Sequence, residues 1–172
     1  IDADGIVANL NGQDFVNKGK LQDIEWAAEQ LSDTDCYDNW QEELRYLLYR
    51  YEEYLCQRKG HKYESEQWQR IWETSAAKSI EHVRPQSKPK GMKNVSRLGN
   101  LILLPPGLNS SLHSRAPKAK SMEYRQSGLL MAVETAERIE SDGEWTVAKM
   151  QQREKEIIDW VRMTWGATAQ QS

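Results

Sequence analysis

Two stretches in the first half of the chain carry apolar residues at helical spacing. In residues 35–57 they recur every three or four positions, as on one face of an α-helix, and Gly60 with the polar residues after it ends the pattern. These positions are Trp40, Leu44, Leu47, Leu48, Tyr51, Tyr54 and Leu55. We predict a shorter helix at residues 66–74 and a further one, with a weaker pattern, at residues 21–31.

Two longer amphipathic patterns close the chain, at residues 121–139 and 145–165, and Asp142 with Gly143 breaks the chain between them. We predict that they form a helical hairpin packed on the rest of the protein. The seven tryptophans of the chain recur mostly at helical spacing, so we assign them to the core rather than to base stacking.

The middle of the chain, residues 76–116, follows no helical period. Two short segments, at residues 79–83 and 101–104, have the length of strands, and a loop rich in Pro, Lys and Gly joins them. Pro105-Pro106-Gly107 then precedes a short helical turn from Leu108. Because irregular insertions in compact domains tend to carry function, we expect the functional site here.

These patterns predict an α+β fold, mainly α, in which a helical domain contains an embedded hairpin. We divide the single compact domain into an N-terminal helical part (1–75), the two-strand and helix insertion (76–125) and the C-terminal helical hairpin (126–172).

Composition narrows the class of protein. A chain of 172 residues, 38% hydrophobic and 28% charged, is typical of one folded domain rather than of a disordered or membrane protein. Its longest apolar run, at residues 101–104, is far below the roughly 20 residues of a membrane helix. The chain begins with Ile1 and shows no secretion signal, so we expect a C-terminal fragment of a longer cytoplasmic protein. Cys36 and Cys56 lack metal-site spacing; we expect two buried thiols, with a disulfide as the less favoured alternative.

Charge is distributed in blocks, although the net charge is only −3. Residues 1–81 hold nine Lys/Arg against 17 Asp/Glu, whereas residues 82–125 hold nine Lys/Arg against Glu123 alone. Such a block either neutralises phosphates of a nucleic acid or forms a solvated loop that pairs with the acidic helices. The candidates to bind nucleic acid are Arg84, Lys88, Lys90, Lys93, Arg97, Arg115 and Lys118.

The insertion also holds the residue types that a metal-assisted phosphodiesterase needs. His82 is a candidate general base, while Glu81 and Asn109 offer oxygens suited to Mg²⁺. Asn100 can hold the loop beside the base and fix the tautomer of His82. Each also has a structural alternative: an ion pair for Glu81, a turn for Asn100 and a helix cap for Asn109.

Three motifs occur in an informative order: EHVRPQ from Glu81, RLGNLILL from Arg97 and LNSSLHSRAPKAK from Leu108. The order resembles the acid-His, Asn and His/Asn series of HNH (ββα-metal) nucleases. More closely, the chain is similar to the HNH-type C-terminal domain of GmrSD-like, modification-dependent restriction enzymes and related phage-defence proteins. LRYLLYRYEEYL before the motifs, and the Trp145…Arg153…Trp165 pattern after them, extend the resemblance over roughly residues 35–165.

The resemblance implies roles for individual residues. His82 would be the general base, Asn100 the orienting residue and Lys120 a phosphate or transition-state contact. Glu81 and Asn109 would be metal ligands, either alone or with His113, which lies four positions after Asn109. The family often has another Asn where Ser114 stands here, and this departure leaves the ligand set open.

We therefore expect a metal-dependent HNH DNA endonuclease or nickase, the effector domain of a restriction or phage-defence protein. Its expected cofactor is Mg²⁺, with Mn²⁺ or another divalent ion as an alternative. Its expected partners are DNA and an N-terminal sensor or NTPase domain of the same longer protein, and no membrane. The alternatives are a catalytically silent DNA-binding or protein-docking module and an RNA-directed HNH nuclease.

Overall fold

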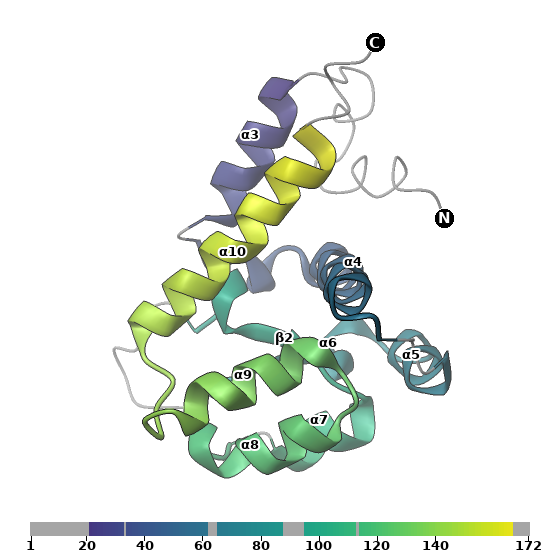
Figure 1. Cartoon of the computed structure of the whole chain (residues 1–172), viewed down its shortest axis with the longest axis vertical. Helices are drawn as coiled ribbons and strands as arrows, with labels where there is room; N and C mark the ends of the chain where they lie inside the picture. Colours follow the sequence, from purple (N-terminus) through teal and green to yellow (C-terminus); the bar gives the residue numbers. More distant parts are fainter. Residues whose placement is uncertain (1–20, 33, 62–64, 88–94, 113, 167–172) are drawn as a thin grey trace.

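The computed structural model of the chain describes residues 21–32, 34–61, 65–87, 95–112 and 114–166 (Figure 1). The first elements are α3 (Leu21–Leu31), the 3₁₀ turn η1 (Cys36–Asp38), α4 (Gln41–Lys59) and α5 (Ser65–Trp72). The central elements are α6 (Ala76–Ser79), β1 (Ile80–His82), η2 (Leu98–Asn100), β2 (Leu101–Leu103) and α7 (Pro106–Leu112). The last are α8 (Pro117–Gln126), α9 (Leu130–Glu140) and α10 (Val147–Gly166).

Helix α4 follows its apolar period. The predicted positions Leu44, Leu47, Leu48, Tyr51 and Leu55 are all buried. Gly60 caps the helix in the left-handed conformation, with φ of 64°, which explains why the helix ends there. The predictions for α3, α4 and α5 are confirmed, with boundaries shifted by a few residues.

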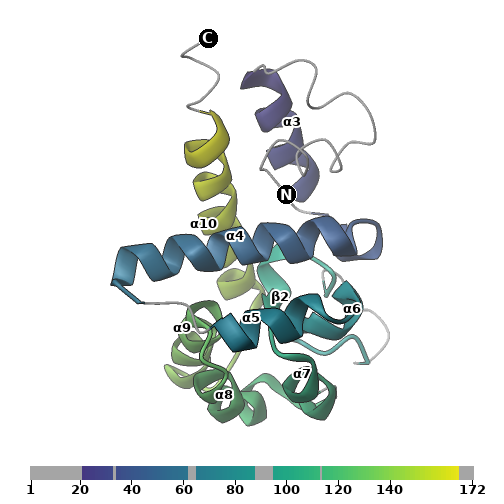
Figure 2. The ribbon, with the colours of Figure 1, turned by 90° about the vertical axis from the view of Figure 1, so that its right-hand side faces the viewer.

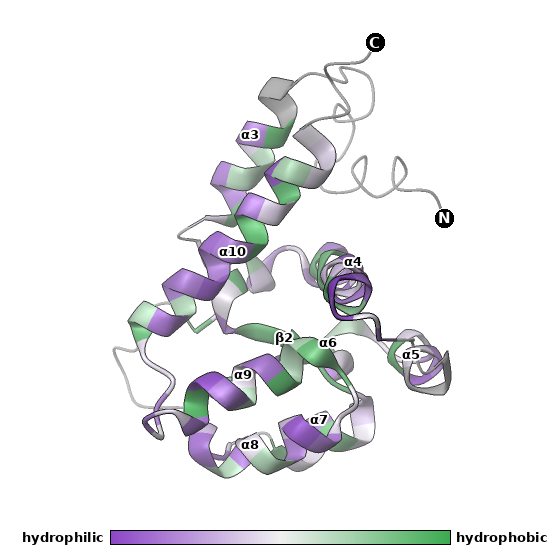
Figure 3. Ribbon diagram, viewed as in Figure 1, coloured by the Kyte–Doolittle hydropathy of each residue, from purple (hydrophilic) through white to green (hydrophobic). Residues whose placement is uncertain are grey.

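The two predicted strands form one antiparallel hairpin. Glu81 pairs with Ile102 and His82 with Leu101, and α7 follows β2. Strand β2 is fully buried and lies between α4 and α9 (Figures 1 and 2). Most of the green, apolar colour of Figure 3 around β2 and α6 belongs to this core. The fold is therefore α+β and mainly helical, as the sequence predicts.

The C-terminal helices differ from the prediction. The pattern at residues 121–139 is divided between α8 and α9 by Gly128, whose φ is 77°. Helix α9 packs on α8, whereas α10 packs on η2 and on α3 (Figure 1). Helices α9 and α10 also meet, through the ion pair of Arg138 with Glu156, but each has its main packing partners elsewhere, because an apolar stripe specifies a buried face and not the partner that covers it.

Two contacts anchor η2 and α9. A Cβ atom at Gly99 would lie 2.0 Å from the main-chain oxygen of Met150, so glycine is needed there for close approach to α10 and not for a turn. Glu52 of α4 is 1% exposed, and its carboxylate accepts hydrogen bonds from the main-chain nitrogens of Leu130 (2.5 Å) and Met131 (2.8 Å) at the start of α9. Burial raises the pKa of Glu52 to about 7.

Cys36 and Cys56 are buried free thiols, as expected. Most tryptophans contribute to the core, but Trp26 and Trp72 are exposed. Within the residues that the structure describes, we find no helix with the length and apolar character needed to cross a bilayer.

Candidate active site

A cavity of about 280 Å³ borders the hairpin. Glu81 and His82 of β1 line it together with Asn109 of α7. Tyr37 of η1 and Ser114, which precedes α8, complete the wall on other sides. The structure thus brings to one cavity three of the residues that the sequence singles out.

Glu81 is 3% exposed and is held by α8. Its Oε1 accepts hydrogen bonds from Lys120 Nζ at 2.6 Å and from Tyr124 Oη at 3.0 Å. Lys120 also donates to the main-chain oxygen of His82, at 2.8 Å. One buried ammonium group therefore fixes both the carboxylate and the backbone next to the imidazole.

Burial changes the pKa of both partners of Glu81. It lowers the pKa of Lys120, while the negative charge of Glu81 acts in the opposite direction. It raises the pKa of Tyr124 well above its usual value, and Glu81 adds to this shift. Tyr124 therefore stays a neutral hydrogen-bond donor.

His82 is 7% exposed and borders the cavity. Its ring packs edge to face on Tyr37, with centroids 4.4 Å apart and an interplanar angle of 81°. This contact restricts the ring to one orientation. A base that is pre-oriented by packing loses little rotational freedom when it accepts a proton.

Asn100 and Asn109 fasten the two ends of β1. The Asn100 amide accepts from Arg84 N (2.9 Å) and donates to the oxygens of Arg84 (3.0 Å) and Val95 (2.7 Å), so it closes the loop after His82. These bonds go to the main chain, and both donors of the amide are used by them. Asn109 Nδ2 donates to the oxygens of Lys78 (2.8 Å) and Ile80 (3.1 Å), which turns its Oδ1 away from these carbonyls.

The donor set suits a hard cation that keeps most of its water. Among the described residues, no group of three or more His, Cys, Asp or Glu side chains is placed to hold a metal. A carboxylate (Glu81) and an amide (Asn109) on one cavity nevertheless match Mg²⁺, which needs only one or two protein ligands. A carboxylate has about four lone-pair sites, so the bonds at Oε1 of Glu81 are compatible with a ligand at Oε2.

Two of the cations that we expect to contact nucleic acid are buried in ion pairs. Arg97 was expected to bind phosphate, but it is 4% exposed and ion-paired with Glu154 of α10, with Nε 3.0 Å from Oε2. We therefore remove Arg97 from that set. Lys120, expected to touch a phosphate, is likewise fully buried and bound to Glu81, so in this arrangement it positions other groups.

The other described cations that we expect to bind nucleic acid are not buried in ion pairs. Arg115 is exposed and pairs with Glu123 at 2.8 Å. Arg84 and Lys118 make no ion pair with any other described residue. Three expected contacts, Lys88, Lys90 and Lys93, and the candidate ligand His113 lie outside the described residues.

Sequence reasoning missed three neighbours of the site: Tyr37, Lys78 and Tyr124. Tyr124 follows Lys120 by four positions on α8, and this spacing places both side chains on one helix face. Its apolar ring at a helical period was the available signal. Nothing local marks Tyr37, which reaches His82 from 45 positions earlier in the chain.

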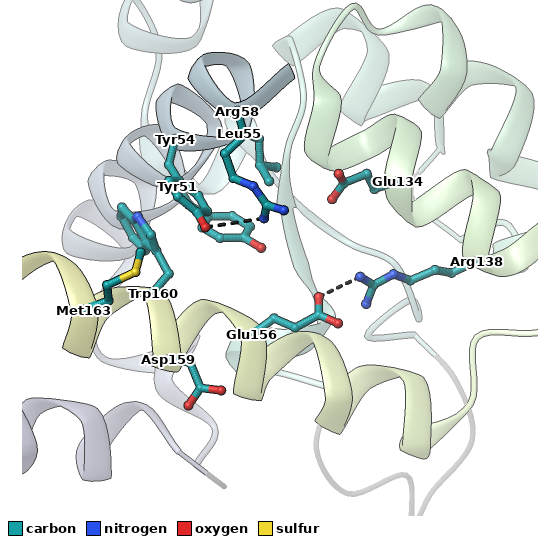
Figure 4. Close-up of a pocket in the computed structure, with 10 residues that line it drawn as sticks. All are labelled: Tyr51, Tyr54, Leu55, Arg58, Glu134, Arg138, Glu156, Asp159, Trp160 and Met163. Atoms are coloured by element: carbon teal, nitrogen blue, oxygen red, sulfur yellow. Dashed lines mark hydrogen bonds and ion pairs between the residues drawn. The ribbon is translucent and has the colours of Figure 1, made fainter. Parts of the chain in front are cut away.

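A larger cavity, of about 450 Å³, lies between α4, α9 and α10 (Figure 4). Tyr51, Tyr54 and Trp160 form its aromatic wall. On its rim Arg138 is ion-paired with Glu156 at 2.6 Å. None of the catalytic or metal-binding candidates lines it, so the hairpin cavity is the better candidate for chemistry.

Taken with its hairpin and following helix, the site defines a mainly helical α+β protein with a polar ββα centre. A family model described as the C-terminal domain of GmrSD restriction endonucleases matches residues 22–160, and the chain belongs to this family. The match confirms the resemblance inferred from the motifs. Membership indicates a nuclease effector of a restriction system. No curated protein and no solved structure matches the chain.

Proposed function

We propose that the protein is a metal-dependent DNA endonuclease or nickase of the HNH type, the effector end of a longer cytoplasmic restriction protein. The observation that carries the proposal is the meeting of Glu81, His82 and Asn109 on one cavity. A bound Mg²⁺ would polarise the scissile phosphate and neutralise charge in the transition state. Family membership supports the nuclease class, and DNA is the natural substrate of a restriction enzyme.

Residues of this chain would supply the general base, the metal ligands and the groups that position them. His82 accepts the proton of the attacking water as a neutral imidazole, held by Tyr37. Glu81 and Asn109 supply the hard oxygen atoms for the metal. Lys120 and Tyr124 hold the Glu81 carboxylate in place, because both donate to Oε1.

Supercoiled plasmid tests the proposal. Wild-type protein with Mg²⁺ or Mn²⁺ should convert it to nicked or linear DNA, and chelation should stop the reaction. His82→Ala should lower the cleavage rate by about 10²–10⁴-fold, the usual contribution of a general base. His61→Ala is the matched control, because His61 is exposed and lies outside the cavity.

The outcomes separate the candidate functions. Cleavage that survives in His82→Ala would mean that another group is the base. DNA binding without cleavage in any divalent ion would favour the silent DNA-binding module. Cleavage of an RNA strand of the same sequence, but not of the DNA, would favour the RNA-directed nuclease.

A further inference from the structure

A second cavity, of about 250 Å³, lies beside the candidate active site. Arg84 and Pro85, Ala116 to Lys118, and Gly143 to Trp145 line it. Two chain segments pass from one cavity to the other: Gln86 and Ser114 line the first, while Arg84 and Ala116 line the second. Each pair is two positions apart, so its two Cα atoms are at most about 7 Å apart. That is comparable with the separation of neighbouring phosphates along one strand of DNA.

Cationic groups of this cavity are not neutralised by the protein. Arg84 and Lys118 form no ion pair among the described residues, whereas many other arginines and lysines do. One carboxylate, Glu144, is exposed at the same cavity and leaves the lining with a net charge of +1. The cavity therefore has cationic donors available to an anion.

Helix α8 adds to this positive potential. Its first residues line the cavity, and it has ten residues with no acidic side chain in the first turn. Its N-cap is Ala116, which provides no side-chain oxygen to the first turn. Pro117 at the start of α8 has no N–H, and the N–H of Ala119 donates to the main-chain oxygen of Ala116 at 2.9 Å, so the helix offers the cavity the N–H of Lys118 and a partial positive charge of about half a unit.

Trp145 provides an independent indication. It is 2% exposed, and its Nε1 is buried without an acceptor anywhere in the part of the chain that the structure describes. Buried N–H groups nearly always have a partner, because a missing one is costly. Trp145 lines the same cavity as Arg84 and Lys118, so an anion bound there would bring an acceptor close to this residue.

We propose that this cavity binds a backbone phosphate of the DNA strand next to the scissile phosphate, through Arg84, Lys118, the N-terminus of α8 and the indole of Trp145. The site deepens the proposed nuclease function and rests on it for the identity of the polymer. Binding of this phosphate would hold the adjoining nucleotide in place and so position the scissile phosphate at His82.

Ala116 allows a sharp test, because one substitution has opposite effects on folding and binding. Ala116→Asp caps α8 and should stabilise the fold, but it places a negative charge in the cavity. Ala116→Asn is the matched control, with nearly the same shape and capping ability but no charge. Affinity for a short labelled duplex is measured by fluorescence anisotropy with chelator present, so that no cleavage occurs.

We expect Ala116→Asp to weaken DNA binding roughly tenfold relative to Ala116→Asn, while thermal unfolding shows both variants folded. Lys118→Gln should reduce the slope of log K against log salt by about 0.9, and the control Lys155→Gln, whose lysine pairs with Asp159, should not. Trp145→Phe, which keeps an aromatic side chain but removes the N–H together with the five-membered ring, should weaken binding severalfold in protein that thermal unfolding shows to be folded; the exposed Trp26→Phe should not.

Equal affinity of Ala116→Asp and Ala116→Asn would overturn the proposal. Inorganic phosphate is the second ligand in the assay. One outcome is that phosphate stabilises Ala116→Asn at micromolar concentration while Ala116→Asp and Ala116→Asn bind DNA with equal affinity. In that case the cavity binds a free anion, and the assignment to DNA is wrong. Loss of binding in Ala116→Asp together with a wild type that never cleaves would support the phosphate site and contradict the nuclease function, so the two failures are distinguishable.

Discussion

Replacement of Lys120 by methionine tests the centre of the site. Lys120 Nζ is fully buried, 2.6 Å from Glu81 Oε1 and 2.8 Å from the main-chain oxygen of His82. Methionine has a similar length but no charge, so Lys120→Met leaves the Glu81 carboxylate buried with Tyr124 as its remaining contact from α8. Removing one partner of a buried ion pair typically costs about 3–5 kcal/mol. We expect that loss in the free energy of unfolding.

The double variant Glu81→Gln, Lys120→Met separates the ion pair from simple packing. It leaves no uncompensated charge, so its loss should be smaller than the sum of the two single losses by about 2–3 kcal/mol. Urea unfolding followed by tryptophan fluorescence measures all four proteins. Lys118→Met is the control: this lysine is exposed and unpaired among the described residues, and its loss should stay within about 0.5 kcal/mol.

Metal adds a second measurement on the same proteins. If Glu81 is a ligand, Mg²⁺ should stabilise Lys120→Met more than wild type, because a cation then replaces the missing ammonium group. The double variant, which lacks the carboxylate, should not respond. Additive losses in the double variant would refute the ion-pair reasoning. A metal response that is unchanged by Glu81→Gln would refute the ligand role.

Two further predictions concern the anchoring contacts. The pKa of Glu52 is raised from 4.5 to about 7, so its contribution to stability is present below about pH 4.5 and is lost as the pH rises through 7, by roughly 3 kcal/mol. Glu52→Gln should remove this fall, which unfolding at pH 5 and at pH 8 measures against wild type; an unchanged pH dependence would contradict it. Gly99→Ala should destabilise the protein by about 1–3 kcal/mol or more, since the added Cβ meets the main chain of Met150. Calorimetry that finds no loss would show that α10 can shift away.

The sequence was sufficient for elements whose signal is local. The apolar period of α4 and Gly60 at its end act within a few residues of each other, and each strand of the hairpin is likewise marked by its own short segment. The break at Gly128 was hidden, because Leu129 and Leu130 continue the buried pattern directly after it. The Ser127-Gly128 pair was the local sign of a turn, and the structure shows it as a positive φ at Gly128.

The candidate site was predictable to the extent that motifs carry it. The order of the motifs was enough to single out Glu81, His82 and Asn109. It did not show that the three residues line one cavity. Their roles stay predictions. The basic block also looked uniform in sequence, but Arg97 is neutralised by Glu154, 57 positions later. A charge count cannot separate a buried ion pair from a surface cation.

Under the proposed function an acidic chain binds a polyanion, and the difference between buried ion pairs and surface cations accounts for it. With a net charge of −3, the protein as a whole would repel DNA at long range. Most of its described cations form ion pairs within the chain. Among the described residues, Arg58, Lys78, Arg84, Lys118 and the buried Arg153 form none, and Lys78, Arg84 and Lys118 are the ones near the hairpin. Lys78 and Arg84 flank β1, and Lys118 lies two positions before the lysine that holds Glu81. These cations lie beside the cavity that holds His82, two of them in the wall of the neighbouring cavity, and we expect affinity to come from a few phosphates close to the cut.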